Sequence, residues 1–437
     1  MWQRLRLAWR LSLLVWLLAN VPAAAQGNSP KVYLITVEGP LTPVTVSYIE
    51  RSIRVSEQAG AAALILTLNT PGGRSDWMQQ IVESVRASEV PIVIYVSPRG
   101  ASAASAGTLI TLAAHVAVMA PETTIGAASP VGAGGEDLGE TLERKAKEDA
   151  RALARGLTQR RGQQATQLAE AMIEEARAVS APEALAAGLI DFIASDQADL
   201  LQKIDGVAVE VAGRSVTLAT VGASLHPIDM SLVEQVLSRV ADPNILALLL
   251  FIGAQAILIE LSSPGGWVAG FVGIVCVALA VYGLGIVPVD WFGLALIVLA
   301  FVLFVLDIKA PTHGVLTIIG AITLVAGLLV LFSQPGAEEF GRLSIPLVAA
   351  LSVGTALFFG FIVAKGLRAQ RVKPVTGVEG LIGSTGIARD DLTPEGQVFV
   401  QGERWRAVAE EGQVLKGTPV QVIGIEGFRL KVRRLQS

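Results

Sequence analysis

The chain has 437 residues, of which 52% are hydrophobic and 16% are charged, and its mean hydropathy is +0.56. These averages are too apolar for an ordinary soluble protein and too charged for a bundle of membrane helices alone, so the chain combines soluble and membrane-embedded parts. The formal net charge of -4 at pH 7 excludes the basic field that nucleic-acid binding requires.

The N-terminus has the pattern of a secretory signal peptide. Arginines precede an apolar run at residues 11–18, and the segment Pro-Ala-Ala-Ala at residues 22–25 puts small residues at the -3 and -1 positions of a cut after Ala25. An uncleaved membrane anchor is the alternative, but the apolar run is short for a bilayer span. Under either interpretation the following segment is exported. We expect residues 1–25 to be a signal peptide.

Residues 31–212 alternate between strand and helix patterns. The run at residues 61–68 is apolar almost without interruption, which suits a strand buried on both faces of a parallel sheet. Ser180 and Glu183 form a capping signal for a helix that stops at Gly188. The predicted strands are residues 32–37, 61–68, 91–96 and 115–120, the predicted helices are residues 44–59, 77–86, 108–114, 138–161 and 165–176, and residues 123–135 are expected to be irregular. These elements predict an α/β domain over residues 26–230.

The middle of the chain is a block of apolar runs that are almost free of charge. Each run has about 17 to 20 residues, enough to cross about 30 Å of hydrocarbon. The runs are residues 245–261, 267–286, 292–308, 315–332 and 345–363. We therefore expect a transmembrane domain of about five helices over residues 240–366.

Two arguments give the orientation of this block. An exported N-terminal domain followed by five spans puts the C-terminus in the cytoplasm. Lys365, Arg368 and Arg371 follow the last run, whereas the loop before it carries Glu338 and Glu339, as the positive-inside rule expects. We expect an integral protein of the inner (plasma) membrane with its α/β domain periplasmic or extracellular and its C-terminus cytoplasmic. The opposite side applies if the first run, which ends on Glu260, is re-entrant.

Residues 374–437 have the pattern of a small all-β domain. Short strands recur every eight to twelve residues and are separated by glycine turns. This spacing predicts an OB-fold barrel. Aromatic residues are few and charge is scattered, which favours a role in interaction or assembly over binding of nucleic acid.

The stretch from residue 66 to residue 130 carries the strongest chemical signal. A buried strand ends at Gly72 and Gly73, and the small-residue run 100–107 places Ser105 just before a helix. A strand that stops at a Gly-Gly turn leaves backbone N–H groups free, and a serine at a helix start exposes its hydroxyl. Together these are the parts of an acyl-transfer site, although an ordinary strand-to-helix turn would also contain such glycines.

A serine hydroxyl is a weak nucleophile until a base removes its proton. His115, the only histidine before residue 200, falls on an alternating apolar strand, which favours a structural role. Lysine is the other candidate, because burial in an apolar pocket lowers its pKa toward neutrality. Lys145 and Lys147 flank the apolar stripe of the helix at 138–161 equally, so helical geometry does not choose between them. Taken alone, this helix favours two solvated surface lysines.

The sequence indicates no metal and no cofactor. Its single cysteine, Cys276, lies in an apolar run, which excludes an intrachain disulfide and a cysteine-based zinc site. None of the histidines at positions 115, 226 and 313 is spaced from acidic residues like a metal-ligand pair.

At this point the residues resemble a known family. The motifs that carry the resemblance are Asn69-Thr70-Pro71-Gly72-Gly73, Ser102-Ala103-Ala104-Ser105-Ala106-Gly107, Met119-Ala120-Pro121, Ile125-Gly126 and, near the end of the chain, Gly402-Glu403-Arg404-Trp405-Arg406-Ala407. As a set they are similar to the ClpP-class serine peptidases and, more closely, to the long membrane-bound NfeD proteins. The resemblance covers nearly the whole chain and implies a ClpP/crotonase-like fold for the exported domain.

The resemblance also implies site residues. Ser105 matches the family nucleophile, and Lys145 matches a lysine base in a Lys-x-x-Asn-Asp setting in which Glu148 stands here in place of the Asn. That departure leaves Lys147 as the second candidate. For the oxyanion, the natural donors are the backbone N–H groups of Gly72 or Gly73 and of Ala106, the residue after the nucleophile.

These observations lead to a functional hypothesis. We expect a membrane-anchored serine endopeptidase with a Ser-Lys dyad that cleaves hydrophobic segments of a stomatin- or prohibitin-like membrane protein. The resemblance implies a homo-oligomer, either a ring or a dimer. The rival hypotheses are a signal-peptide-peptidase-like hydrolase, which an internal duplication of the soluble domain would favour, and a non-catalytic membrane scaffold that organises stomatin- or flotillin-like partners.

Overall fold

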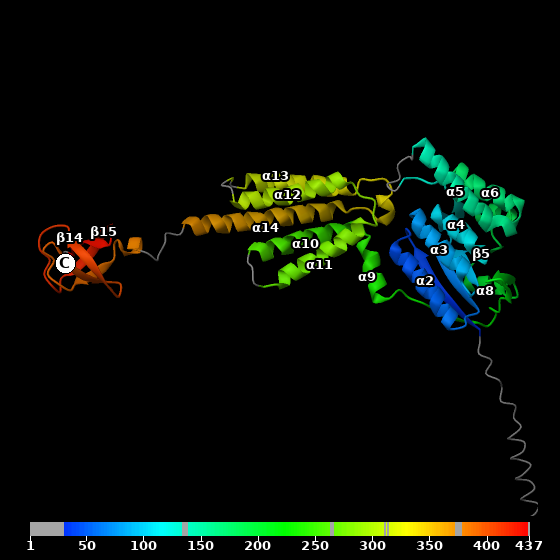
Figure 1. Ribbon diagram of the computed structural model, residues 1–437, viewed down its shortest axis with the longest axis horizontal. Helices are drawn as coiled ribbons and strands as arrows, with labels where there is room; N and C mark the ends of the chain where they lie inside the picture. Colours follow the sequence, from blue (N-terminus) through cyan, green and yellow to red (C-terminus); the bar gives the residue numbers. More distant parts are fainter. Residues whose placement is uncertain are drawn as a thin grey trace, which may run out of the picture. The chain divides into compact units, whose positions relative to one another are not determined.

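The structure is a computed structural model that describes residues 30–132, 139–262, 266–309, 312, 314–371 and 378–435 (Figure 1). The signal peptide expected at residues 1–25 lies outside these ranges and stays a prediction. The chain divides into two compact units, one with the α/β domain and most of the helical block, the other with the C-terminal barrel and the helix segments 304–318 and 356–371.

A parallel six-stranded sheet forms the centre of the α/β domain. Its strands are β11 (Ser224–Pro227), β1 (Lys31–Glu38), β2 (Ala63–Asn69), β3 (Ile92–Val96), β5 (Val116–Met119) and β8 (Phe192–Ile193), in that order, and every pairing is parallel. All five side chains of β3 are buried, as are six of the seven in β2. Burial on both faces explains why these strands are uninterrupted apolar runs.

Two hydrophobic layers cover the sheet. On one face, side chains such as Leu66 and Ile94 pack with α2 (Pro43–Gln58), α3 (Ser75–Ala87) and α4 (Ala106–Ala113). On the other, alternate side chains such as Ile65 and Val93 pack with α8 (Gln197–Ile204) and the hairpin of β9 (Ala208–Val211) and β10 (Arg214–Thr217). The sheet and its flanking helices confirm the predicted α/β domain.

A second, small sheet was not predicted. It consists of β4 (Ser102–Ala104), β6 (Thr124–Gly126) and β7 (Ala178–Ser180), with β4 parallel to β6 and β6 antiparallel to β7. The expectation that residues 123–135 are irregular is therefore wrong for 124–126. These strands are three residues long and rich in Ala, Ser and Gly, which have low strand propensity, so pairing alone defines them.

Helices complete the domain. The helix expected at residues 138–161 is α5 (Glu140–Thr158) followed by the 3₁₀ turn η1 (Gln159–Arg161), and residue 138 lies outside the described ranges. The other two are α6 (Gln163–Glu174) and α7 (Ala181–Ala186). The predicted capping box is present, because Glu183 accepts the Ser180 N–H at 2.8 Å.

Five apolar helices follow a short helix, α9 (Leu232–Val240). They are α10 (Pro243–Ser262), α11 (Val268–Leu284), α12 (Trp291–Lys309), α13 (Val315–Leu331) and α14 (Ile345–Arg371), with the 3₁₀ turn η2 (Ala337–Phe340) before the last. Among the described residues, the segment Pro243–Leu261 is both long and apolar enough to cross a membrane, and each of the other four contains a shorter apolar helix. The predicted helical block is confirmed.

Two acidic side chains cap the helix that follows their own. Glu260, near the end of α10, accepts the Gly270 N–H of α11 at 3.2 Å, and Asp307, near the end of α12, accepts the Thr317 N–H of α13 at 3.3 Å. In both hairpins the acid precedes its partner by ten residues. Each carboxylate satisfies backbone donors that an apolar environment would leave unpaired.

The C-terminal region is a closed five-stranded barrel. Its strands are β12 (Thr385–Ala388), β13 (Glu395–Val400), β14 (Glu403–Ala409), β16 (Arg429–Arg434) and β15 (Pro419–Glu426) in that order, preceded by the 3₁₀ turn η3 (Val378–Leu381). Val398, Val420 and Leu430 are fully buried inside it. The predicted fold class is confirmed in all three parts: a ClpP-like α/β domain, a helical block and an OB-like barrel.

We predict that Asp307→Leu destabilises the α12–α13 hairpin and that Asp307→Asn does so much less. Asp307 is 2% exposed, and its carboxylate also accepts the hydroxyls of Thr312 and Thr317. Leucine would leave these buried donors unpaired, at about 1–3 kcal/mol for each group, whereas asparagine keeps an acceptor oxygen. The measurement is the unfolding midpoint of the purified chain in mixed micelles. Equal midpoints for the two variants would contradict this role.

Candidate active site

Ser105 stands at the sharp turn between β4 and α4. Its backbone has φ 53° and ψ -121°, a conformation that residues with a side chain rarely adopt. The Ser105 N–H donates to the Gly126 carbonyl at 2.9 Å, and its side chain makes no capping bond to the helix. Strain of this kind costs about 1–3 kcal/mol and persists only where the surroundings fix it. The turn places the half-buried serine side chain at the start of a helix.

The Gly-Gly turn after β2 lies directly against this serine. A Cβ on Gly72 would stand 2.7 Å from the Ser105 Cβ and 3.1 Å from its Oγ, so only glycine fits there. The neighbouring Gly73 is packed against Leu41, whose Cβ would lie 2.7 Å from an added methyl. The structure thus brings together the two motifs that the sequence places about 30 residues apart.

The oxyanion donors differ in availability. The Gly72 N–H donates to the Thr70 hydroxyl at 3.0 Å and is already in use. Ala106 is the first residue of α4, so its N–H has no partner within the helix. The Gly73 N–H makes no hydrogen bond to another of the described residues. Of these backbone groups, the Gly73 N–H has no partner among the described residues and the Ala106 N–H has none within its helix.

Thr108 is a positioning residue that the sequence analysis missed. Its hydroxyl lies 2.9 Å from the Ala103 carbonyl and 3.0 Å from the Gly126 carbonyl, and it accepts the Gly126 N–H at 3.0 Å. It is 1% exposed. Thr108 thus ties the first turn of α4 to β4 and β6, the strands on both sides of Ser105. A threonine in an apolar helix gives no signal of this role from sequence alone.

His115 is not placed to act as a base. It is buried at the start of β5, and its Nδ1 accepts the Ile92 N–H at 3.0 Å. Burial, together with the positive charges of Arg160 and Arg86, lowers the pKa of His115 to about 4. The ring is neutral and committed to the backbone, as the sequence pattern suggested.

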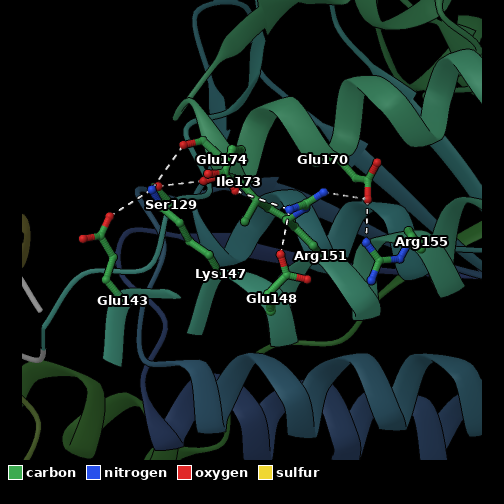
Figure 2. Close-up of polar contacts among 9 residues, drawn as sticks. All are labelled: Ser129, Glu143, Lys147, Glu148, Arg151, Arg155, Glu170, Ile173 and Glu174. Atoms are coloured by element: carbon green, nitrogen blue, oxygen red, sulfur yellow. Dashed lines mark hydrogen bonds and ion pairs between the residues drawn. The ribbon is translucent and has the colours of Figure 1, made fainter. Parts of the chain in front are cut away.

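The two candidate lysines lie in different environments on α5. Lys147 is half-buried, and its Nζ lies 2.9 Å from a Glu143 oxygen and 3.3 Å from the Glu174 carbonyl of α6 (Figure 2). The hydrogen bond to Glu143, with the charges of Glu143 and Glu174, raises the pKa of Lys147. Lys145 is exposed, and among the described residues no hydrogen bond or ion pair joins it to Ser105. The structure assembles the serine with its glycines but not with a lysine.

Charge pairs hold α5 and α6 together beyond Lys147. Arg155 lies 2.6 Å from Glu170, and Arg151 lies 2.7 Å from Glu148 and 3.5 Å from Glu170 (Figure 2). Ser129 is placed beside this pair of helices, where its hydroxyl donates to the Ile173 carbonyl at 2.7 Å. Glu148, which departs from the resembled motif, is therefore a structural partner of Arg151.

A half-buried serine at a strained strand-to-helix turn, in an α/β domain joined to apolar helices, is the arrangement expected of a membrane-bound serine peptidase. The chain matches three families: the NfeD1b N-terminal domain over residues 31–213, the NfeD integral membrane domain over residues 244–365, and the NfeD-like C-terminal, partner-binding domain over residues 378–434. The chain belongs to the NfeD family of membrane-bound proteases.

Relatives match along the whole chain. It is 36% identical over 436 residues to the membrane-bound protease PH1510 of Pyrococcus horikoshii, covering 97% of both chains. It is 27% identical over 444 residues to the membrane protein NfeD1b of Bacillus subtilis, covering 97% of this chain and 98% of the relative. Among solved structures, it is similar to a lysine-to-alanine variant of the 1510-N membrane-bound stomatin-specific protease in complex with a substrate peptide. That match has 34% identity and a TM-score of 0.44, and it covers 48% of this chain and 96% of the other.

We predict that Thr108→Val lowers kcat for peptide hydrolysis on the order of 10²-fold, because a small shift of the serine turn misplaces the nucleophile. Thr108→Ser keeps the hydroxyl and should stay within about threefold of the wild type. Steady-state kinetics should show the Val effect in kcat and not in KM. An unchanged kcat for Thr108→Val in a folded protein would refute the positioning role.

We predict that His115 makes the stability of the α/β domain depend on pH. The unfolded histidine takes up a proton as the pH falls through about 6.5, whereas the folded one stays neutral until about 4. Its contribution is therefore complete above pH 6.5 and is lost progressively toward pH 4, by about 2 kcal/mol at pH 5.

His115→Asn is the matched variant, because its Oδ1 can accept the Ile92 N–H and does not titrate. Unfolding midpoints at pH 7.5 and pH 5 should differ less for this variant than for the wild type. Identical pH dependence of the two proteins would show that His115 titrates normally.

Proposed function

We propose that this chain is a serine endopeptidase in which Ser105 is the nucleophile and Lys145 is the base. The strained turn at Ser105, packed against Gly72, is the observation that carries the proposal. It puts the serine side chain against the Gly-Gly turn and at the first residue of α4, where backbone N–H groups could stabilise an oxyanion as acyl transfer requires.

The contrast between the lysines supports Lys145 as the base. A base must be neutral before it can accept a proton. Lys147 is engaged by Glu143 and by the Glu174 carbonyl, and its raised pKa keeps it charged. Lys145 has no such partner among the described residues. An apolar substrate segment laid along α5, where Leu142 is 60% exposed, would exclude water from Lys145 and favour its neutral form.

The reaction follows the Ser-Lys variant of acyl transfer. Lys145 Nζ takes the proton as Ser105 Oγ attacks the peptide carbonyl, and the N–H groups of Ala106 and Gly73 hold the oxyanion. Collapse of this intermediate breaks the C–N bond, and the lysine gives its proton to the leaving amine. Water then hydrolyses the acyl ester with the lysine again as base.

The substrate we propose is an apolar segment of a stomatin- or prohibitin-like membrane protein. A solved relative is described as stomatin-specific, and the barrel of this chain matches a partner-binding domain. We further propose that the protease domain lies outside the cytoplasm and that the barrel lies inside, as the basic residues after the last apolar run indicate. A homo-oligomer, as the resemblance implies, belongs to the same proposal.

We predict that Ser105→Ala and Lys145→Ala each lower kcat/KM for an apolar fluorogenic peptide by at least about 10³-fold, because nucleophile and base act as a unit. Lys147→Ala is the matched control on the same helix and should retain activity within about tenfold, since it removes only the ion pair with Glu143 and the hydrogen bond to the Glu174 carbonyl. The measurement uses the purified full chain in lipid nanodiscs, with thermal unfolding to confirm that each variant is folded.

Two results would overturn this assignment. Full turnover by Ser105→Ala would remove the serine mechanism, and loss of turnover in Lys147→Ala but not in Lys145→Ala would move the base to Lys147. Mass spectrometry of the products from a co-expressed stomatin-like protein should place the cut within its apolar segment. A cut in a polar segment would refute the substrate class alone.

A further inference from the structure

Helix α9, between the α/β domain and the first apolar helix, has an uncovered hydrophobic face. Leu232, Val233 and Val236 are 79%, 67% and 55% exposed. At 100° per residue these side chains fall on one side of the helix, together with Leu237 and Val240. The opposite side carries the polar residues Glu234, Gln235 and Ser238, and Arg239 lies at the edge of the apolar face next to Leu232. The helix is amphipathic, yet no described residue covers the exposed part of its apolar face.

The polar face of α9 is fastened to the α/β domain. Glu234 forms a 2.7 Å ion pair with Arg51 of α2, and the same guanidinium donates to the Asp229 carbonyl at 2.8 Å. Tyr48, one turn earlier on α2, donates its hydroxyl to the Ile228 carbonyl. The hydrogen bond from Arg51, supported by its charge, holds the pKa of Glu234 below its usual range, which is consistent with a persistent pair. Because the polar side is fixed to α2, the position of the apolar face is fixed as well.

The chain continues from α9 directly into the membrane block. Only Ala241 and Asp242 separate Val240 from α10, whose segment Pro243–Leu261 is apolar enough to cross a bilayer. The three Cα–Cα steps from Val240 to Pro243 reach at most about 11 Å, so a membrane-spanning α10 would keep the end of α9 close to the membrane surface. Val240 also packs against α11, because a Cβ on Gly283 would lie 2.8 Å from the Val240 Cγ1.

We propose that α9 is an interfacial helix whose face of Leu232, Val233 and Val236 is buried in the headgroup–acyl boundary of the bilayer. Through the Arg51–Glu234 pair, this helix fixes the orientation of the α/β domain relative to the membrane. Amphipathic helices with such a face lie in the plane of the interface. The partner is the lipid surface on the side of the α/β domain. This inference does not depend on which residues carry out proteolysis.

The orientation of the α/β domain matters for the candidate site because the start of α2 contacts that site. Leu41, just before α2, donates its N–H to the Gly72 carbonyl at 2.8 Å and packs against Gly73. The helix that Arg51 anchors therefore begins beside the glycine turn that contacts Ser105. An anchored α9 keeps this turn at a constant distance from the membrane surface, where membrane-associated substrates lie.

The first experiment measures contact with lipid. The full chain carrying Cys276→Ser receives a single cysteine, either Val236→Cys on the apolar face or Ser238→Cys on the polar face, each labelled with an environment-sensitive fluorophore in nanodiscs that contain brominated phosphatidylcholine. We expect quenching at position 236 at least about twice that at position 238. Val233→Cys repeats the measurement on the same face if the first variant folds poorly.

Two outcomes would overturn the lipid contact. Equal quenching at positions 236 and 238 would mean that α9 has no lipid-facing side. Cross-linking of Val236→Cys between copies, without quenching, would mean that a second copy of the chain covers the apolar face of α9.

The second experiment tests the anchor. A fluorophore on Glu89→Cys in the Cys276→Ser background reports the distance of the α/β domain from an acceptor dye at the membrane surface by time-resolved energy transfer. Arg51→Ala should broaden the distance distribution. Arg54 is an exposed arginine on the same helix whose one ion pair among the described residues is with Glu50 at 3.9 Å, so Arg54→Ala should leave the distribution unchanged. An unchanged distance distribution in Arg51→Ala would refute the proposal that this ion pair fixes the orientation of the α/β domain.

Discussion

The candidate site depends on one backbone constraint, the positive φ of Ser105. A residue with a Cβ can hold this conformation only if its neighbours leave no alternative. The bond from its N–H to Gly126, the hydroxyl of Thr108 between β4 and β6, and the lack of a side chain at Gly72 together provide that restraint. Each of these features is costly or unusual by itself. Together they hold the Ser105 side chain away from the backbone of α4 and against the Gly-Gly turn.

Electrostatics divide the roles of the basic residues on α5. Lys147 and Arg151 are used to join α5 to α6 and are surrounded by the carboxylates of Glu143, Glu148, Glu170 and Glu174. Such pairs fix the helix but keep the cations charged. Lys145 lies outside this network among the described residues. The carboxylates that hold Lys147 and Arg151 therefore orient the helix that carries Lys145, the base in our proposal.

Much of this architecture could be predicted from the sequence, and the misses have physical causes. Strands β2 and β3 were found because burial on both faces requires unbroken apolar runs, and the Ser180–Glu183 cap was found because its chemistry is local. Strands β4 and β6 were missed because three residues of Ala, Ser or Gly carry no periodic signal. The roles of Thr108 and of the Arg51–Glu234 pair were missed because they depend on partners that folding brings together, in the second case from 183 residues away. Ser105 and its glycines could be named from motifs. The different surroundings of Lys145 and Lys147 could not be predicted, because they depend on how α6 packs against α5.

The acids inside the apolar block show how a sequence signal can change its meaning in the structure. Glu260 at the end of the first apolar run suggested that this run could be re-entrant. In the structure its carboxylate accepts N–H groups at the start of α11, and Asp307 does the same for α13 at an identical spacing of ten residues. A helix start in apolar surroundings cannot rely on water for its free N–H groups, so the preceding helix supplies an acceptor. The hairpin that Glu260 closes therefore accounts for an acid at the end of α10. The acid is not by itself a reason to interpret α10 as re-entrant.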